Sequence, residues 1–494
     1  MGSVIQFYLA ILIIGFVVIK DKKISFCVTL FGYFLAVIDL LSYKMLKHHI
    51  DYFTLSRIDW SMIEMAKDVV PKYFYGSIFV TVLVILICWY LSQNIHAATL
   101  KNRKISVLIF CLSVIMVFTS KTSVAYKNIV YSAFKMNKYE FYSLSDVLVD
   151  LKSSKQYKFN EDIVSLKGKN LVFIYCESLE NGFLNKNDFP VEMPMLTSLV
   201  EKGWYSFTNY KCLPGSSWTV GALYATQTSL PAFFTGVYGK GHKWMEAGGN
   251  NIFKSVSQTK AVSWASVLEK AGYKNLFLSS GDLDFAGTGN IMRLLGYKTK
   301  DFKSILQSKN TAWGMHDYDL FEMAKKEYDY LKNTGEPFNL TLLTVDTHFP
   351  KGIPDGRMKN LVNTGLDKDS HEFTLATIDY LIGDFVEYIE RNDFQRDTVI
   401  VICGDHLMMG DSKTTPIVQK LDANSRRILF MTNQKTRDYG INDEVAFFDI
   451  PHIVLNLLGV EHNAYFSRDL FEDMSEEFIL NNKEQFAILN SKLN

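Results

Sequence analysis

A buried strand that ends in an acid and a histidine is the strongest constraint on the fold of this chain. Residues Val399 to Cys403 are all apolar, and such a run is typical of a strand covered on both faces, as in a parallel sheet between helices. Asp405 and His406 follow directly after Gly404. Open α/β sheets bind their ligands at the carboxyl ends of the strands. A carboxylate beside an imidazole suits a divalent metal, although a solvated turn fits the same pair.

Strand-like and helix-like patterns alternate from Asn170 onward. Strands are expected at Leu171–Cys176, Asn275–Ser279, Asn339–Val345, Thr398–Cys403 and Ile428–Thr432. Helices are expected at Thr219–Thr228, Val262–Ala271, Tyr318–Leu331, Thr374–Ile389 and Ile450–Leu458. Such alternation predicts one doubly wound α/β domain, in which helices cover both faces of a mostly parallel sheet.

The first 120 residues are of a different kind. They contain four apolar runs that are nearly free of charge, at Val4–Ile19, Ile24–Tyr43, Tyr73–Leu91 and Ile105–Phe118. About 20 apolar residues span a bilayer as a helix. The first and last runs are shorter than this, so each alone also fits a buried helix. Four such runs in succession, in a chain that is 48% hydrophobic, predict a transmembrane region of four helices at residues 1–122.

Basic residues between the runs predict the orientation in the membrane. Lysine-rich loops at 20–23 and 101–104 join the first two and the last two runs, and short basic loops stay in the cytoplasm. Residues 123–168, expected to form a juxtamembrane helix and a connector, should then lie outside, with the α/β domain at 169–494. A helical pattern at 58–69 fits either a helix on the outer leaflet or one packed on the spans. Zero net charge argues against a nucleic-acid partner.

Acids and histidines gather where three of the expected strands end. Glu177 follows the first strand, Asp346 and His348 follow the third, and Asp405 and His406 follow the fourth. One acid at a strand end is commonplace. Three strand ends of one parallel sheet meet at the same edge, so these side chains are expected to converge on a site.

The segment PGSSWTVGALYATQTSLP, residues 214–231, supplies candidate nucleophiles. Its proline and glycine predict a turn, and a helix is expected to follow. A hydroxyl of Ser216, Ser217 or Thr219 in the first helical turn would face backbone N–H groups, which favour an anion such as a phosphate. A metal held by the strand-end residues would make such a hydroxyl nucleophilic. The alternative is that all three hydroxyls only cap the helix.

Taken together, these segments resemble a known family. The motifs occur in the order found in bacterial membrane phosphoglycerol transferases, which belong with the lipoteichoic acid synthases to the alkaline phosphatase and sulfatase superfamily. The resemblance covers about residues 168–460, and FFDIPHIVLNLLGV is similar to the closing helix of that superfamily. The motifs are NLVFIYCESLE, PGSSWTVGALYATQTSLP, GDLDFAG, AWGMHDYDLF, LTVDTHFP and DTVIVICGDHLMM.

The resemblance implies a sulfatase-like catalytic domain at 169–494 and a chemistry for it. It implies a divalent metal, Mn²⁺ or Mg²⁺, and a donor lipid, phosphatidylglycerol. The Thr219 hydroxyl would attack the phosphorus, diacylglycerol would leave, and a periplasmic or surface glycan would take the glycerophosphoryl group. His348 would move a proton in each half-reaction. The protein would be a multi-pass protein of the bacterial inner (cytoplasmic) membrane with an extracytoplasmic catalytic domain. The implied metal ligands are Glu177, Thr219, Asp405 and His406.

The sequence also departs from the family. Where relatives carry a basic side chain shortly after the FAG-like motif, this chain has Thr288. The sulfatase motif of Cys or Ser followed by x-Pro-x-Arg is absent around Thr219, which argues against sulfate ester hydrolysis. Two alternatives stay open at this point. One is a phosphoethanolamine transferase of the same fold, and the other is a catalytically inactive, membrane-anchored sensor or scaffold.

Overall fold

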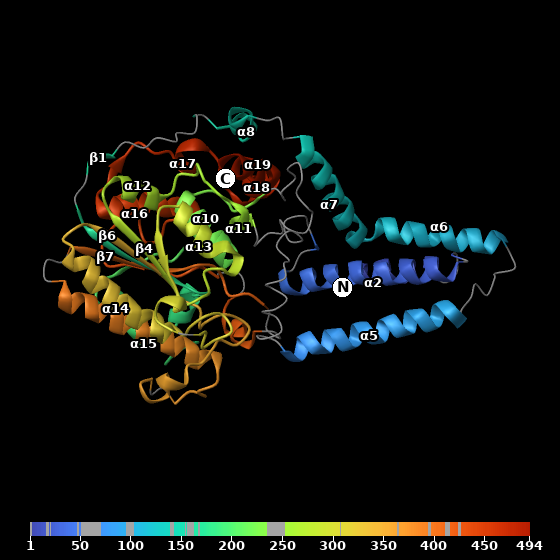
Figure 1. Ribbon diagram of the computed structural model, residues 1–494, viewed down its shortest axis with the longest axis horizontal. Coiled ribbons are helices and arrows are strands. Elements are labelled where there is room, and N and C mark those ends of the chain that lie inside the picture. The colour runs from blue at the N-terminus through green and yellow to red at the C-terminus, as the bar shows by residue number, and fades with distance from the viewer. Residues whose placement is uncertain are drawn as a thin grey trace. The chain divides into compact units, whose positions relative to one another are not determined.

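The computed structural model divides into two compact units, Met1–Lys138 and Tyr139–Asn494. Figure 1 shows the helices of the first unit and the sheet and helices of the second. The structure describes residues 2–15, 19, 21–46, 49–50, 71–94, 103–138, 143–153, 155, 163–165, 168–234, 252–306, 308–362, 365–393, 397–410, 415–422 and 426–494. The helix expected at 58–69 lies outside these residues.

Helices form over all four apolar runs of the first unit. They are α1 (Gly2–Ile13), α2 (Lys22–Leu46), α5 (Pro71–Asn94) and α6 (Arg103–Thr119), and α7 (Lys121–Lys138) follows. Helix α1 packs against α2 and α6, and α5 packs against α2. Helix α5 exposes a long series of large apolar side chains, a surface typical of contact with lipid rather than water. These side chains are Phe79, Val80, Val82, Leu83, Leu86, Ile87, Trp89 and Tyr90.

The four-span count is not confirmed. Among the described residues, Lys22–Leu40 alone is long and apolar enough to cross a bilayer as one helix. A second span exists only if Ile109–Thr119 and Lys121–Val130, which meet at a bend of 67°, count as one. The 12-residue helix α1 is about 18 Å long, against about 30 Å for the hydrocarbon core. The predicted membrane character therefore rests on one or two helices.

The second unit is built on a seven-stranded sheet in the order β3-β8-β7-β2-β6-β4-β5. The five strands from β7 to β5 are parallel, whereas β8 pairs antiparallel with both β7 and the edge strand β3. The sheet is therefore mixed, and the predicted α/β class is confirmed. The strands are β2 (Asn170–Cys176), β3 (Tyr205–Ser206), β4 (Lys274–Ser279), β5 (Lys298–Lys300), β6 (Phe338–Leu343), β7 (Thr398–Gly404) and β8 (Phe430–Thr432).

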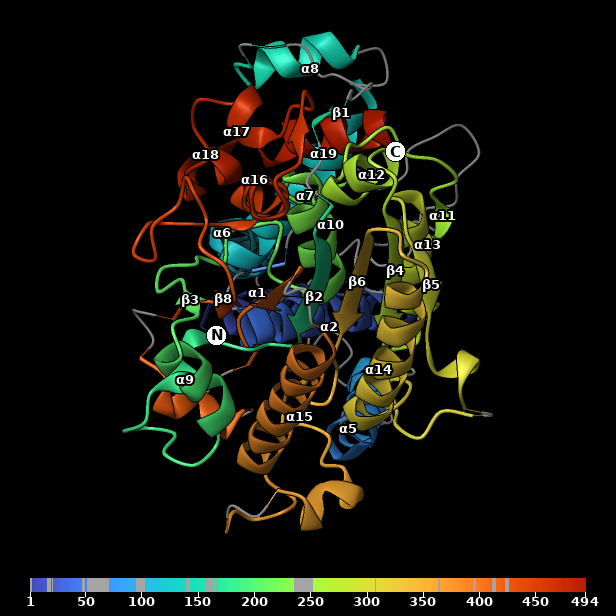
Figure 2. The same cartoon turned by 90° about the vertical axis from the view of Figure 1, so that its left-hand side faces the viewer.

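Helices cover both faces of this sheet (Figure 2). Helices α9 (Pro194–Glu201), α14 (Asp317–Asn333) and α15 (His371–Asn392) pack on one face, with α10 (Thr219–Thr228), α12 (Trp264–Lys270) and α16 (Ile450–Leu458) on the other. Alternate β2 residues point to opposite faces because the side-chain period of a strand is two. Val172 and Ile174 join the core beneath α14 and α15, whereas the Phe173 ring lies 5.7 Å from the Trp264 ring of α12.

The structure shifts several predicted boundaries. Strand β6 ends at Leu343 rather than Val345, so Asp346 and His348 lie in the loop beyond it. Strand β8 begins at Phe430 rather than Ile428. The region expected to be a polar connector holds helix α8 (Leu144–Asp150) and strand β1 (Ile163–Ser165), which pairs with β9 (Glu461–His462). Apolar periodicity marks the middle of an element more sharply than its ends.

A buried carboxylate on α15 gives this unit a pH-dependent stability. Asp379 accepts hydrogen bonds from the N–H groups of Met195 and Leu196, both at 2.8 Å, at the start of α9. Burial raises the pKa of Asp379 from 3.8 to about 7 despite these bonds. The folded state therefore binds the proton more tightly than the unfolded state, so the contribution is fully present below about pH 4 and is lost as the pH rises to about 7.

We expect Asp379→Asn to flatten the dependence of stability on pH. The neutral amide keeps an oxygen that accepts from α9 and carries no charge to desolvate. The free energy of unfolding of the wild type should fall between about pH 4 and 7 by up to about 4 kcal/mol more than that of the variant. Urea unfolding followed by tryptophan fluorescence measures both. Parallel curves for the two proteins would contradict the assignment of the slope to Asp379.

Candidate metal and nucleophile site

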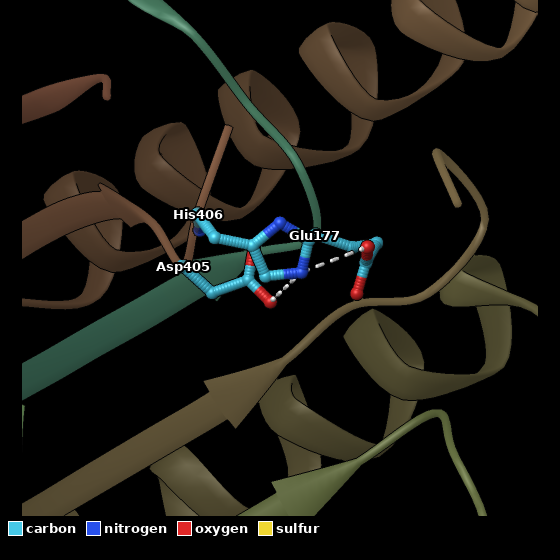
Figure 3. A group of neighbouring side chains, drawn as sticks. All are labelled: Glu177, Asp405 and His406. Carbon is cyan, nitrogen blue, oxygen red and sulfur yellow. Dashed lines mark hydrogen bonds and ion pairs between the residues drawn. The ribbon is translucent and has the colours of Figure 1, made fainter. Parts of the chain in front are cut away.

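Three of the predicted ligands meet at the carboxyl ends of two neighbouring strands. Glu177 directly follows β2, and Asp405 and His406 directly follow β7. The two strands pair in parallel, with Cys176 opposite Gly404. One ligand atom from each residue lies within 4.8 Å of the other two, and all three residues are buried. Figure 3 shows the His406 ring between the two carboxylates.

The electrostatics of this group favour an added positive charge. Burial, together with the nearby Glu177 carboxylate, raises the pKa of Asp405 to about 7. Burial lowers the pKa of His406, but Asp405 and Glu177 outweigh burial, and this pKa is raised. His406 Nε2 lies 3.4 Å from Asp405 Oδ2 and 3.6 Å from Glu177 Oε1. A divalent cation between these atoms would relieve the repulsion between two buried carboxylates.

The hydrogen bonds leave the right atoms available for a cation. Asp405 Oδ1 accepts from the N–H groups of Ser178 and His406, both at 2.7 Å, whereas Oδ2 is buried and has no hydrogen-bond partner among the residues that the structure describes. His406 Nδ1 lies 2.8 Å from the Leu407 carbonyl, which can only accept, so Nδ1 carries a proton and Nε2, which faces the carboxylates, is the atom that a cation would bind in place of a proton. Metal-ligating histidines usually donate their other N–H in this way. The residues therefore fit a divalent cation.

Thr219 lies beside these three ligands and belongs to α10, on the face of the sheet opposite α14 and α15. It is the first residue of α10, and its hydroxyl donates to Glu177 Oε2 at 3.2 Å and lies 3.4 Å from His406 Nε2. The N-terminal end of α10 carries partial positive charge and free N–H groups, which favour a phosphate nearby. The Thr219 hydroxyl therefore lies close enough to the candidate ligands to bind the same cation.

The other two candidate hydroxyls do not cap the helix, contrary to the expectation for Ser216 and Ser217. The N-cap is Trp218, and it makes no side-chain cap hydrogen bond. Ser216 is buried and donates to the Leu213 carbonyl at 2.9 Å, within the preceding turn, whereas Ser217 is exposed. The turn depends on Gly215, whose φ of +89° suits glycine. The sequence pattern did not predict Trp218 as the N-cap, because serine is a common residue at that position and tryptophan is a rare one.

His348 lies in the loop after β6 and makes none of the hydrogen bonds that link the three ligands. Its Nδ1 lies 2.7 Å from the Phe349 carbonyl, so Nδ1 carries a proton. The ring lies against Trp313, with centroids 4.1 Å apart, and stacks on Phe349. Burial, with a further contribution from His406, lowers the pKa of His348 to about 4. The ring is therefore neutral near pH 7, with its lone pair on Nε2.

A network of buried hydrogen bonds around Asp317 and Asp346 holds this loop in place. Asp317 accepts from the N–H groups of Val345 and Asp346, at 2.8 and 3.0 Å, and from the Ser280 hydroxyl. Asp346 in turn accepts from Asp317 N and lies 3.1 Å from His316 Nδ1. Burial and the neighbouring Asp346 raise the pKa of Asp317. The repeated acids of AWGMHDYDLF and LTVDTHFP were the available signal for this pairing.

Two threonines and a buried ion pair complete the support, and the sequence did not reveal them. Glu177 N donates to the Thr344 hydroxyl at 3.0 Å, and the Thr347 hydroxyl donates to the Glu177 carbonyl at 2.5 Å. Glu180 is buried and pairs with Arg426, and it also accepts from Met408 N at 2.9 Å. The strand end that carries Glu177 is thereby joined to the segment that follows His406.

Thr288, where relatives carry a basic side chain, is used locally. Its hydroxyl donates to the Phe285 carbonyl at 2.9 Å, and the residue is buried at the start of α13 (Thr288–Leu294). The departure therefore replaces a cation by a hydroxyl that closes its own turn.

Comparison with known proteins places this site in context. The chain is similar to the phosphoglycerol transferase I of Salmonella typhi, with 29% identity over 329 residues, which cover 64% of this chain and 41% of that protein. It is also similar to the phosphoglycerol transferase I of Citrobacter koseri, with 28% identity over 333 residues, or 65% of this chain and 41% of that protein. The chain spans about two fifths of the length of these relatives.

Solved structures are similar as well. One is a protein of the alkaline phosphatase superfamily from Vibrio parahaemolyticus, with a TM-score of 0.49 and 20% identity, covering 65% of this chain and 75% of that one. Another is the lipoteichoic acid synthase LtaP of Listeria monocytogenes, with a TM-score of 0.48 and 19% identity, covering 70% and 81%. The sulfatase family model matches residues 169–460. This match extends over more than half of the sequence, from the start of β2 to just past α16, and the chain therefore belongs to the sulfatase family.

Proposed function

We propose that this protein is a metal-dependent phosphotransferase that moves a glycerophosphoryl group from phosphatidylglycerol to a glycan. The observation that carries the proposal is the Thr219 hydroxyl, 3.2 Å from Glu177 Oε2 and 3.4 Å from His406 Nε2 at the start of α10. A hydroxyl among candidate metal ligands, at the positive end of a helix, suits attack on a phosphodiester. The similarity to proteins named phosphoglycerol transferase I supports the choice of the transferred group.

The reaction would run in two successive transfers, first to Thr219 and then to the acceptor. In the first, Thr219 Oγ forms a bond to phosphorus, the bond from phosphorus to the diacylglycerol oxygen breaks, and the proton lost by Thr219 equals the one diacylglycerol gains. In the second, the oxygen of an acceptor hydroxyl forms a bond to phosphorus, the bond from phosphorus to Thr219 Oγ breaks, and the proton lost by the acceptor equals the one that Thr219 recovers. Glu177, Asp405 and His406 would hold a Mn²⁺ or Mg²⁺ ion with Thr219. When bound, this ion would lower the pKa of the hydroxyl and withdraw charge from the phosphate.

Individual residues have different roles in these two steps. Glu177 Oε2 accepts the hydrogen bond of the Thr219 hydroxyl, which orients the attacking oxygen. The neutral His348 ring, with its proton on Nδ1, supports a role as proton acceptor at Nε2 when the glycan hydroxyl attacks. The exposed apolar surface of α5 supports a membrane setting, which a lipid donor requires. We place the catalytic unit outside the bacterial cytoplasmic membrane, where glycans are found.

The donor assignment predicts which lipid is consumed. We expect the full-length protein in detergent micelles with Mn²⁺ to release labelled diacylglycerol from phosphatidylglycerol and to leave phosphatidylethanolamine intact. Thin-layer chromatography of lipid labelled in its acyl chains measures both. Release from phosphatidylethanolamine alone would instead identify a phosphoethanolamine transferase. Release from neither lipid, by protein that binds the metal, would favour an inactive sensor or scaffold.

A further inference from the structure

The C-terminal helix reaches the nucleophile helix through one buried amide. Asn490 lies on α19 (Lys483–Leu493) and is fully buried. Its Nδ2 donates to the carbonyls of Pro231 and Phe233 at 2.8 and 2.7 Å, and its Oδ1 accepts from the Tyr224 hydroxyl at 3.0 Å. An amide can donate twice, so both of its donors are used on one short segment of backbone.

That segment lies directly against the turn that precedes Thr219. Ala232 N donates to the Gly215 carbonyl at 2.9 Å. A Cβ at Gly215 would lie 2.6 Å from the Pro231 Cβ, so the two stretches of chain are in close contact. Gly215 holds a φ of +89° and stands four residues before Thr219. A shift of residues 231–233 would therefore move the turn that sets the start of α10.

The third partner of Asn490 belongs to α10 itself. Tyr224 stands five residues after Thr219, is fully buried, and packs its ring against Phe234 and Phe253. Asn490 thus contacts the chain on both sides of Thr219, through Tyr224 on one side and through the 231–233 segment, which holds the preceding turn, on the other. One restraint before Thr219 and one after it hold the position of this residue and the direction of α10.

A second contact from the C-terminal segment holds the far end of α10. Ser229 ends the helix with a φ of +63°, and Ser467 N donates to the Ser229 hydroxyl at 2.7 Å. The Ser467 hydroxyl donates back to the Ser229 carbonyl at 2.5 Å. Ser467 and Asn490 both lie beyond residue 460, where the match to the sulfatase family ends. These contacts therefore join residues beyond the matched region to residues within it.

We infer that Asn490 is a positioning residue for Thr219, a role that rests on the proposed function of that threonine. A buried amide costs free energy unless its hydrogen bonds are made, and an apolar side chain would fill the same space without that requirement. The amide differs from an apolar side chain because its hydrogen bonds are directional. They fix the Pro231 and Phe233 carbonyls and the Tyr224 hydroxyl relative to one another. A misplacement of about 1 Å lowers turnover by up to roughly 100-fold even when it originates far from the reacting atoms.

The test compares substitutions at Asn490 with a neighbour on the same helix. Asn490→Ala removes all three bonds, Asn490→Asp keeps the acceptor for Tyr224 but cannot donate, and Tyr224→Phe removes only the hydroxyl. Ser491→Ala is the control, since that side chain is exposed and bonds to Ala487 of its own helix. Full-length protein in micelles with Mn²⁺ and an added glycan acceptor is assayed for diacylglycerol release from phosphatidylglycerol and for cleavage of bis(p-nitrophenyl) phosphate, together with bound metal and thermal midpoint.

We expect Asn490→Ala and Asn490→Asp to lower kcat roughly 10- to 100-fold, with KM for the lipid and bound metal unchanged, and Tyr224→Phe to lower it less. A helix that only stabilised the fold would shift the midpoint and leave kcat of the folded fraction intact, and that result would overturn the inference. If Asn490→Ala does not fold, the kcat values of Asn490→Asp and Tyr224→Phe test the positioning role instead.

The second substrate separates this inference from the donor assignment. Wild-type protein that cleaves the synthetic diester but not phosphatidylglycerol would refute the proposed donor, and the Asn490 variants would still be read on the diester. Wild-type protein that uses both substrates, with Asn490→Ala equally fast, would refute the positioning role alone. Full diester cleavage by Thr219→Ala would refute both.

Discussion

Replacing Thr219 by alanine should abolish release of diacylglycerol from phosphatidylglycerol, with a fall in kcat on the order of 10³-fold or more. The reason is chemical, because alanine has no oxygen to form the bond to phosphorus. The loss should leave the fold intact, since Thr219 is the first residue of α10 and, among the described residues, its hydroxyl forms hydrogen bonds only with Glu177 and His406. Labelled diacylglycerol released per mole of folded protein measures the effect.

Three variants make this result specific. Thr219→Ser keeps the attacking oxygen and should retain measurable turnover. Ser217→Ala changes an exposed side chain and should leave turnover unchanged. Ser216→Ala removes the bond to the Leu213 carbonyl, which costs about 0.5–1.5 kcal/mol of stability, and should still turn over. Steady release by Thr219→Ala, or loss of release in Ser217→Ala, would mean that the nucleophile is not Thr219.

The second large effect concerns the metal. His406→Ala and Asp405→Asn should weaken binding of Mn²⁺ at least roughly 100-fold and lower turnover in parallel, because each removes a ligand atom from a three-residue group. Excess chelator should silence the wild type, and Mn²⁺ should restore it. Metal analysis of the purified protein and a titration followed by thermal midpoint measure binding.

Matched controls separate ligand loss from general damage. Asp379→Asn changes another buried carboxylate whose pKa is raised to about 7, and His452→Ala changes a partly buried histidine beside Phe466. Both should keep the metal and the activity. In metal-free protein, Asp405→Asn should unfold at the same temperature as wild type or higher, because it removes one of two repelling carboxylates. Undiminished metal binding in His406→Ala would refute the proposed site.

The parts of this structure that follow from local apolar pattern were predictable. The uninterrupted run from Val399 to Cys403 became β7, with all of its residues buried. The acids at the strand ends converged because parallel neighbours such as β2 and β7 place their ends at one edge. That reasoning needs only the order of residue types and the geometry of a parallel sheet.

The parts that depend on contacts distant in sequence were not predictable. Serines 216 and 217 looked like caps, yet the start of α10 is set by Gly215 against Pro231, a packing contact that no local pattern encodes. The pairing of Asp317 with the 345–346 backbone, and of Glu180 with Arg426, joins residues 28 and 246 positions apart. Four apolar runs suggested four spans, but the bend after Thr119 and the short α1 leave one or two among the described helices.

The most direct test of the central claim is the mass of the enzyme trapped between the two half-reactions. Full-length protein is incubated with Mn²⁺ and phosphatidylglycerol labelled in its head group, without any glycan acceptor, and is then digested and analysed by mass spectrometry. We predict a labelled glycerophosphoryl group on the peptide that carries Thr219, and its disappearance when an acceptor glycan is added. Label on Ser216 or Ser217, or turnover with no labelled peptide under these conditions, would contradict the account.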